Sequence, residues 1–323
     1  MKLTEGRLAR AYGRRVRQAA YVAVLLIASR SAAAQRHAAP ALQRHQVVAD
    51  DGHALTVWFK RPVATPRGEV VLLHGRTWSA LPNFDLHVSG LHVSLMDALV
   101  ARGYAVYALD QRGYGATTRD ETGWLTPDRA ARDAGEVLDW VAGGAPHGRR
   151  PALFGYSRGS MTALLLATRQ PEKLSSLILY GLAYDVSHRR DTVPEPPAPP
   201  RANTTQTAAA EDFISPDSTP SGVKEAYVRD ATMRDPVRTD WRHEEQFGAI
   251  DVAAIHTPTL AINGERDPVA KAANVPEFMS RLAGMDRAWV VLSHSDHVAH
   301  LERQQAFVNA LVSFLERAAP SSR

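Results

Sequence analysis

Continuous apolar runs alternate with amphipathic segments along most of this chain, and no other feature restricts its fold so strongly. Three of the runs cover residues 69–74, 104–109 and 151–156. Runs of this kind are typical of strands that are buried on both faces. The segments near 90–102 and 128–142 lie between these runs and have the spacing of helices, and residues 158–169 follow the third run with the same pattern. This order predicts an α/β fold with a mostly parallel central sheet flanked by helices.

Further strands of this sheet are expected before residue 69 and after residue 169. Residues 45–60 contain two alternating runs around Asp51-Gly52, which predicts a β-hairpin. Later strands are expected at residues 174–180, 257–263 and 288–292, and a closing amphipathic helix at residues 301–317.

Residues 183–248 interrupt the alternation. Prolines cluster near the start of this stretch, and a helical segment with Trp241 and Phe247 lies near its end. An excursion of this length between two strands of one sheet is too long for a plain loop. We therefore expect an inserted cap rather than a strand at 183–248, and a core formed by residues 35–182 and 249–323. A partly disordered surface insertion is the alternative for the proline-rich part.

The first 34 residues have the features of an export signal. A basic stretch over residues 2–17 precedes an apolar run over residues 19–28, and small residues follow up to Ala34. The apolar run is far shorter than the roughly 20 residues that span a bilayer. We therefore expect cleavage after Ala34 and an exported protein, periplasmic or secreted, with no stable membrane span. Arg14-Arg15 leaves a twin-arginine route open, although Arg17 favours the general secretory route; a frayed basic tail is the other alternative.

Charge and cysteine content exclude several function classes. The chain has a net charge of +4, but its first 34 residues hold seven Lys or Arg and one Glu. The remainder therefore has a net charge of −2, and nothing in it indicates nucleic-acid binding. The chain has no cysteine, which excludes disulfides, thiolate metal sites and a cysteine nucleophile.

The segment Gly155-Tyr156-Ser157-Arg158-Gly159 carries the strongest chemical signal. It stands between a predicted buried strand and a predicted helix. A serine on such a tight turn takes strained backbone angles, and the flanking glycines leave room for the neighbouring strand and helix. The turn would present the Ser157 hydroxyl at the carboxyl edge of the sheet, where open α/β sheets bind ligands. A serine that only caps the helix is the alternative.

A serine hydroxyl needs a base to activate it and a third group to orient that base. Asp267 follows one late strand and His297 follows the next, so the order serine, acid, histidine is complete. His294, His297 and His300 recur every three residues, so a metal site is an alternative. No carboxylate or cysteine at a suitable spacing completes a known metal site, however.

At these positions the chain resembles the α/β-hydrolase superfamily, over about residues 45–317 apart from the cap. The matching motifs are His74-Gly75, the segment from Asp110 to Gly115, the serine turn, and Asp267 and His297. One departure is Asp296, where a glycine is usual. The resemblance implies that the backbone N–H groups of Arg76 and Arg158 receive the oxyanion, and that Asp185 is an alternative acid. Arg112 is expected to anchor its own turn.

These residues predict a serine hydrolase that needs no cofactor or metal. Ser157 would attack the acyl carbon of a small-molecule ester, His297 would transfer the proton, and Asp267 would orient His297. Lactone, thioester, carbon–carbon and peptide or amide cleavage use the same side chains, so they remain alternatives. A non-catalytic ligand-binding protein of the same fold is the alternative from another class. The apolar residues of the cap hint at a partly hydrophobic ligand or form the core of the cap; they are Phe213, Ile214, Tyr227, Trp241 and Phe247.

Overall fold

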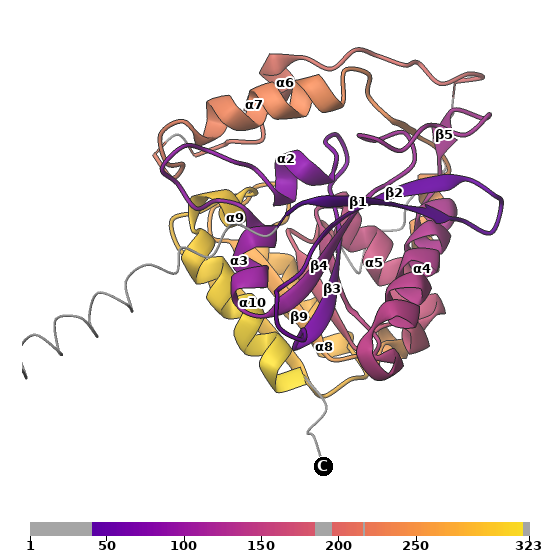
Figure 1. Cartoon of the computed structure of the whole chain (residues 1–323), viewed down its shortest axis with the longest axis vertical. Helices are drawn as coiled ribbons and strands as arrows, with labels where there is room; N and C mark the ends of the chain where they lie inside the picture. Colours follow the sequence, from indigo (N-terminus) through magenta and orange to yellow (C-terminus); the bar gives the residue numbers. More distant parts are fainter. Residues whose placement is uncertain (1–40, 185–195, 216, 319–323) are drawn as a thin grey trace, which may run out of the picture. The chain divides into compact units, whose positions relative to one another are not determined.

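An eight-stranded sheet forms the centre of the computed structural model (Figure 1), which describes residues 41–184, 196–215 and 217–318. The strands lie in the order β1-β2-β4-β3-β6-β7-β9-β10. Their bounds are β1 Gln43–Val48, β2 Ala54–Lys60, β3 Gly68–Leu73, β4 Tyr104–Asp110, β6 Ala152–Tyr156, β7 Ser176–Tyr180, β9 Thr259–Gly264 and β10 Arg287–Leu292.

Strand direction confirms the predicted sheet. β1 and β2 form an antiparallel hairpin, and β2 is antiparallel to β4. Every neighbouring pair from β4 to β10 is parallel. The hairpin turns at Gly52, which has a φ of +82°. Glycine adopts this angle without strain, whereas residues with a side chain do not.

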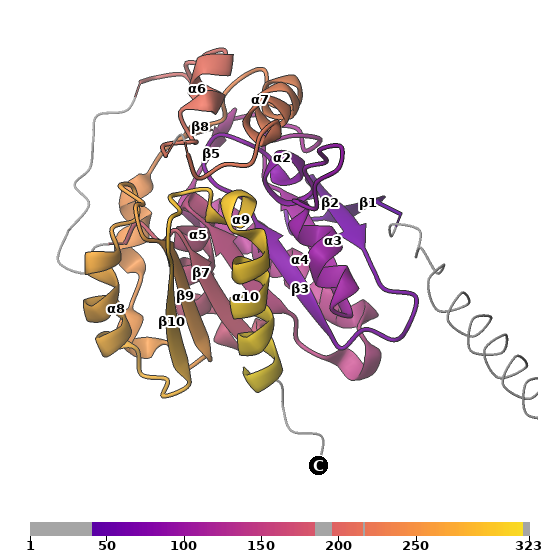
Figure 2. The ribbon, with the colours of Figure 1, turned by 90° about the vertical axis from the view of Figure 1, so that its left-hand side faces the viewer.

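Helices cover both faces of the sheet because alternate residues of each strand point to opposite sides. Val71, Leu73 and Leu153 pack against helices on one face, and Val70, Leu72 and Phe154 pack against helices on the other. Figure 2 shows α3 and α10 in front of the sheet and α4 and α5 behind it. The first face carries α4 Pro127–Gly144, α5 Arg158–Arg169 and α8 Val275–Arg281, and the second carries α2 Ala80–Phe84, α3 Leu95–Ala101 and α10 Gln304–Ala318.

Two predicted helices differ in extent from the structure. The helix expected near 90–102 begins only at Leu95, because the Ser94 side chain accepts the Asp97 N–H and caps it. The closing helix is divided at Arg303 into α9 Ala299–Glu302 and α10. The short α9 holds the Glu302 carboxylate beside the backbone N–H of Asp296, at 2.8 Å.

The described part of residues 183–248 lies over one end of the sheet, where Figures 1 and 2 show α6 Gln206–Ala210 and α7 Val223–Arg234. Contrary to the prediction, this segment does contribute a strand: β8 Asp240–Trp241 pairs in parallel with β5 Trp124–Leu125. Short 3-10 helices complete the structure at η1 Pro146–Gly148, η2 Pro171–Lys173, η3 Glu244–Ala249, η4 Val252–Ala254 and η5 Ala272–Asn274.

The apolar residues of this segment do not share one environment. Phe213 and Tyr227 belong to a separate cluster with Trp78. Trp241 and Phe247 join the main core beside α4 and α5. Ile214 is exposed. Most of these side chains therefore fix the segment to the core.

Two predictions fall outside the described residues: the export signal at residues 1–34 and the alternative acid Asp185. Within the described residues, no helix combines the length and the apolar character that a membrane crossing requires.

Candidate active site

Ser157 occupies a strained turn between β6 and α5. Its φ is 53° and its ψ is −117°, a positive-φ conformation that non-glycine residues rarely adopt. A Cβ on Gly155 would collide with the backbone of Gly159, and a Cβ on Gly159 would collide with the backbone carbonyl of Leu73. The turn therefore needs both glycines, as the sequence pattern indicated. The Ser157 N–H donates to the carbonyl of Tyr180 at 2.8 Å, which ties the turn to β7.

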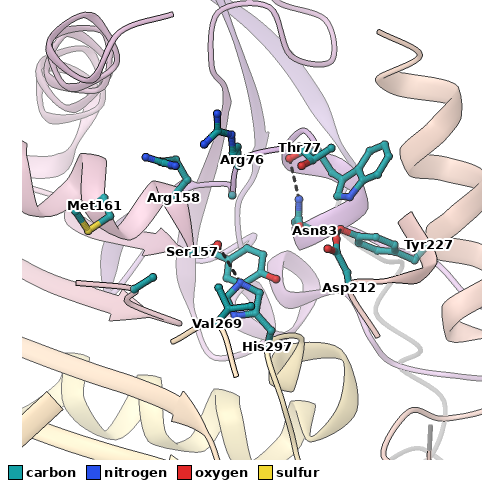
Figure 3. Close-up of a pocket in the computed structure, with 14 residues that line it drawn as sticks. Arg76, Thr77, Asn83, Ser157, Arg158, Met161, Asp212, Tyr227, Val269 and His297 are labelled. Carbon is teal, nitrogen blue, oxygen red and sulfur yellow. Dashed lines mark hydrogen bonds between the residues drawn. The ribbon is translucent and has the colours of Figure 1, made fainter. Parts of the chain in front are cut away.

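The structure brings Ser157 and His297 together. Nε2 of His297 lies 2.9 Å from Oγ of Ser157, and Figure 3 shows the imidazole directed at the serine. At this distance the hydroxyl donates to a neutral imidazole nitrogen.

Asp267 completes the set from the other side of the ring. Its Oδ2 lies 2.8 Å from Nδ1 of His297, and its side chain is fully buried. Its Oδ1 accepts the N–H groups of Val269 and Ala270, each at 2.9 Å. These bonds hold the carboxylate in place, so His297 carries its proton on Nδ1 and leaves Nε2 as an acceptor. The three groups can thus deprotonate an alcohol and stabilise the resulting imidazolium.

Asp296 does not disturb the histidine turn, although a glycine is usual at its position. Its Oδ1 accepts the N–H of Val298, and its Oδ2 accepts the N–H of Ser215 at 2.6 Å. The carboxylate thus satisfies the backbone of the turn and joins it to residues of the 183–248 segment.

The neighbouring histidines lie in different surroundings. His300 is buried, with Nε2 donating to the carbonyl of Asn83 at 2.9 Å and Nδ1 near the hydroxyl of Tyr180. Burial lowers the pKa of His300 to about 3. His294 is exposed and contacts Arg266. The three histidines therefore do not face a common point.

Another group of possible metal ligands lies outside this site. Asp85, His87 and Asp97 bring their ligand atoms close together. The ammonium of Lys60 lies 2.6 Å from both carboxylates and offsets part of their negative charge, so a buried ion-pair network already engages two of the three side chains.

Arg76 and Arg158 both line the pocket beside Ser157. Figure 3 shows their side chains pointing away from His297. Arg158 begins α5, directly after the nucleophile, where helix N–H groups point toward the serine. Arg76 stands in the loop after β3, next to the buried His74, whose Nε2 accepts the Gln111 N–H. The roles of their backbone N–H groups remain a prediction.

Arg112 anchors its turn as predicted. Its Nε lies 2.6 Å from Asp133, and one Nη lies 2.7 Å from Asp51.

The pocket above Ser157 has a volume of about 270 Å³. Its wall includes the apolar side chains of Trp78, Met161 and Val269. A polar end is formed by Asp212, whose carboxylate accepts the Tyr227 hydroxyl at 3.0 Å. Burial raises the pKa of Asp212 to about 6. Asp212 was not predicted as a site residue from the sequence. The one hint that it lies in a pocket was its position next to Phe213 in a short, largely apolar segment.

The chain matches the family model described as "Serine aminopeptidase, S33" over residues 64–304. A curated relative from Metapseudomonas resinovorans, 2-hydroxy-6-oxo-6-(2'-aminophenyl)hexa-2,4-dienoic acid hydrolase, is 26% identical over 240 residues, which cover 70% of this chain and 78% of the relative.

Solved structures share the fold. A hydrolase from Pseudomonas aeruginosa is 21% identical with a TM-score of 0.62, and the match covers 84% of this chain and 98% of the other. An esterase from Exiguobacterium antarcticum is also 21% identical with a TM-score of 0.60, covering 85% of this chain and 100% of the esterase.

Proposed function

Because the chain belongs to the serine aminopeptidase S33 family of α/β hydrolases, we propose that it is a serine hydrolase that cleaves carboxylic esters of small molecules through an acyl-enzyme. The observation that carries the proposal is the continuous hydrogen-bonded path from Asp267 through His297 to Ser157, with distances of 2.8 and 2.9 Å. This geometry is the one that activates a serine hydroxyl.

In this reaction, Oγ of Ser157 bonds to the acyl carbon while its proton moves to Nε2 of His297. The carbonyl oxygen takes the negative charge of the tetrahedral intermediate and would accept the N–H groups of Arg76 and Arg158. The imidazolium then gives its proton to the leaving alkoxide, and the acyl group remains on Ser157. Water repeats these steps with His297 as base, which releases the acid and restores the serine.

The pocket supports a small substrate with a polar group. A cavity of about 270 Å³ holds an acyl group of modest size. The Asp212 carboxyl and the Tyr227 hydroxyl offer hydrogen bonds at one end of the cavity, whereas Met161 and Val269 are apolar. We expect short or branched acyl groups to be preferred over long chains.

Carbon–carbon bond cleavage is the second candidate, and the similarity to the Metapseudomonas resinovorans hydrolase favours it. The same three side chains would serve that reaction, with a carbanion equivalent as the leaving group. The dienoate in that relative's name, 2-hydroxy-6-oxo-6-(2'-aminophenyl)hexa-2,4-dienoic acid, is therefore the probe that separates the two candidates.

The test combines active-site labelling with a substrate panel. A fluorophosphonate should label the protein, and Ser157→Ala should abolish labelling. p-Nitrophenyl esters of graded chain length, lactones, thioesters, aminoacyl amides and the dienoate are then compared by kcat/KM. Ester turnover that exceeds dienoate turnover supports the first candidate, and the reverse supports the second. A folded protein that no probe labels would instead be a ligand-binding protein.

We also propose that residues 1–34 direct export. The basic stretch and the short apolar run support this proposal. Expression of the full chain with fractionation, followed by N-terminal sequencing of the mature form, tests it. A new N-terminus at Gln35 in the exported fraction is expected, and an uncleaved cytoplasmic product would contradict the proposal.

A further inference from the structure

One carboxylate joins the two residues beside Ser157 that we assign to the oxyanion. Oε1 of Glu244 lies 2.8 Å from Nη1 of Arg76, and Oε2 of Glu244 lies 2.7 Å from Nη1 of Arg158. Glu244 begins η3 in the 183–248 segment, whereas Arg76 and Arg158 belong to the sheet core. A single side chain thus bridges the loop after β3 and the first residue of α5, which are 82 residues apart in sequence.

The loop that carries Arg76 needs such support. Residues 74–79 form neither helix nor strand, so few backbone hydrogen bonds fix the loop. The carbonyl of Arg76 accepts the hydroxyl of Tyr114, and this hydroxyl accepts the indole N–H of Trp241 at 2.8 Å. The 183–248 segment therefore holds Arg76 at its backbone and at its side chain.

Arg158 is held from the same segment. Its guanidinium lies 5.6 Å from the ring centre of Trp241 and 5.4 Å from that of Phe247. Its side chain is only 12% exposed. Stacking and the ion pair together restrict this long side chain to one position.

From these contacts we propose that Glu244 is a positioning residue that fixes the Arg76 and Arg158 backbone N–H groups relative to Ser157. The proposal rests on the proposed hydrolase function. Because N–H donors must lie within a few tenths of an ångström of the oxyanion, a displaced donor loses much of its effect on the transition state. Glu244 does not touch the substrate in this scheme and acts through the two arginines.

Position and charge predict opposite effects for Glu244→Gln. This change leaves two guanidinium groups without their shared carboxylate, so the rim of the site becomes more positive. A more positive rim would favour an oxyanion and raise kcat if charge alone mattered. Loosened N–H groups would lower kcat instead.

The experiment compares Glu244→Gln and Glu244→Ala with the control Glu245→Gln. Glu245 is the adjacent acidic residue, and its side chain pairs with the partly exposed His243 at 3.3 Å. Turnover of the best ester from the panel gives kcat and KM, and inhibition by a boronic acid that mimics the tetrahedral intermediate gives affinity for the transition state. We expect both Glu244 variants to lose about 10- to 100-fold in kcat and a similar factor in boronate affinity. KM should change less than about threefold, and Glu245→Gln should match the wild type.

Two results would overturn the proposal: an unchanged or increased kcat in Glu244→Gln, or a loss confined to KM. A thermal melt of each variant shows whether the fold is intact, and Glu244→Gln is the variant on which the conclusion rests if Glu244→Ala unfolds. The wild-type protein tests the proposed function separately. If it shows neither ester turnover nor boronate binding, the proposed function is wrong, whatever the Glu244 variants do.

Discussion

Nδ1 of His297 lies 2.8 Å from Oδ2 of Asp267, although 30 residues separate the two in the sequence. Each follows a strand of the same parallel pair, β9 and β10. The carboxyl ends of parallel neighbours meet at one sheet edge, so adjacent strands deliver the acid and the base to the same place. β6 delivers Ser157 to that edge two strands away.

Ser157 and His297 should act as one unit. Ser157→Ala and His297→Ala should each lower kcat by about 10⁴- to 10⁶-fold, and the double variant should lose little more, because either change alone disables proton transfer to the same nucleophile. Initial rates with a p-nitrophenyl ester measure this. Losses that multiply in the double variant would contradict the assignment.

Asp267 should be the orienting acid. Asp267→Asn keeps the shape of the side chain but can turn an NH₂ group toward His297 and select the wrong tautomer, so kcat should fall by about 10⁴-fold. Asp185→Asn is the matched variant and should retain kcat within about threefold. The opposite pattern would identify Asp185 as the acid.

Asp212 should impose a pH dependence on activity. Burial raises its pKa to about 6, so its negative charge develops as the pH rises through that value. The charge favours the His297 imidazolium in the transition state. Asp212→Asn should therefore match the wild type near pH 5 and fall to about one tenth of its kcat/KM at pH 7.5. A ratio of wild type to variant that does not change with pH would refute this role.

His300 should make the fold less stable in acid. Burial lowers its pKa to about 3 in the folded protein, so only the unfolded chain binds a proton as the pH falls below 6.5. The free energy of unfolding therefore decreases with falling pH, by about 2 kcal/mol between pH 6.5 and 5.0 from this residue. Urea unfolding at several pH values measures the slope.

His300→Gln should be less stable than the wild type at pH 7.5 and show a shallower slope in acid. The exposed His256 provides a control, because His256→Gln should keep the wild-type slope. Buried His74 contributes with the same sign, since burial lowers its pKa to about 4, so some slope should remain in the His300 variant. An unchanged slope in His300→Gln would exclude His300 as a source.

Two glycine substitutions should act in opposite directions. A Cβ on Gly159 would collide with the backbone carbonyls of Leu73 and His74, so Gly159→Ala should lower stability by about 1–3 kcal/mol or more and reduce labelling of Ser157. Gly143 lies in α4 with open space around it, so Gly143→Ala should raise stability by up to about 1 kcal/mol. Thermal melts compare the two, and a Gly159→Ala protein as stable as the wild type would contradict the steric argument.

Local patterns in the sequence determined the sheet, the helices and the strained serine turn. Strand burial follows from short apolar runs, and the turn follows from two glycines whose neighbours leave no room for a Cβ. The order of Ser157, Asp267 and His297 was readable because each follows a strand of one parallel sheet, and such ends converge by geometry. The core helices α4 and α5 were predicted to within two residues for the same reason.

Tertiary structure decided what no local pattern encodes. Pairing of β8 with β5, the break at Arg303 and the contacts of Asp212 and Glu244 depend on side chains that are far apart in the sequence. The 183–248 segment takes its place from burial of Phe213 and Tyr227 against Trp78, rather than from a periodicity of its own. A sequence pattern reports which face of an element is apolar, whereas only the folded chain shows which other element that face meets.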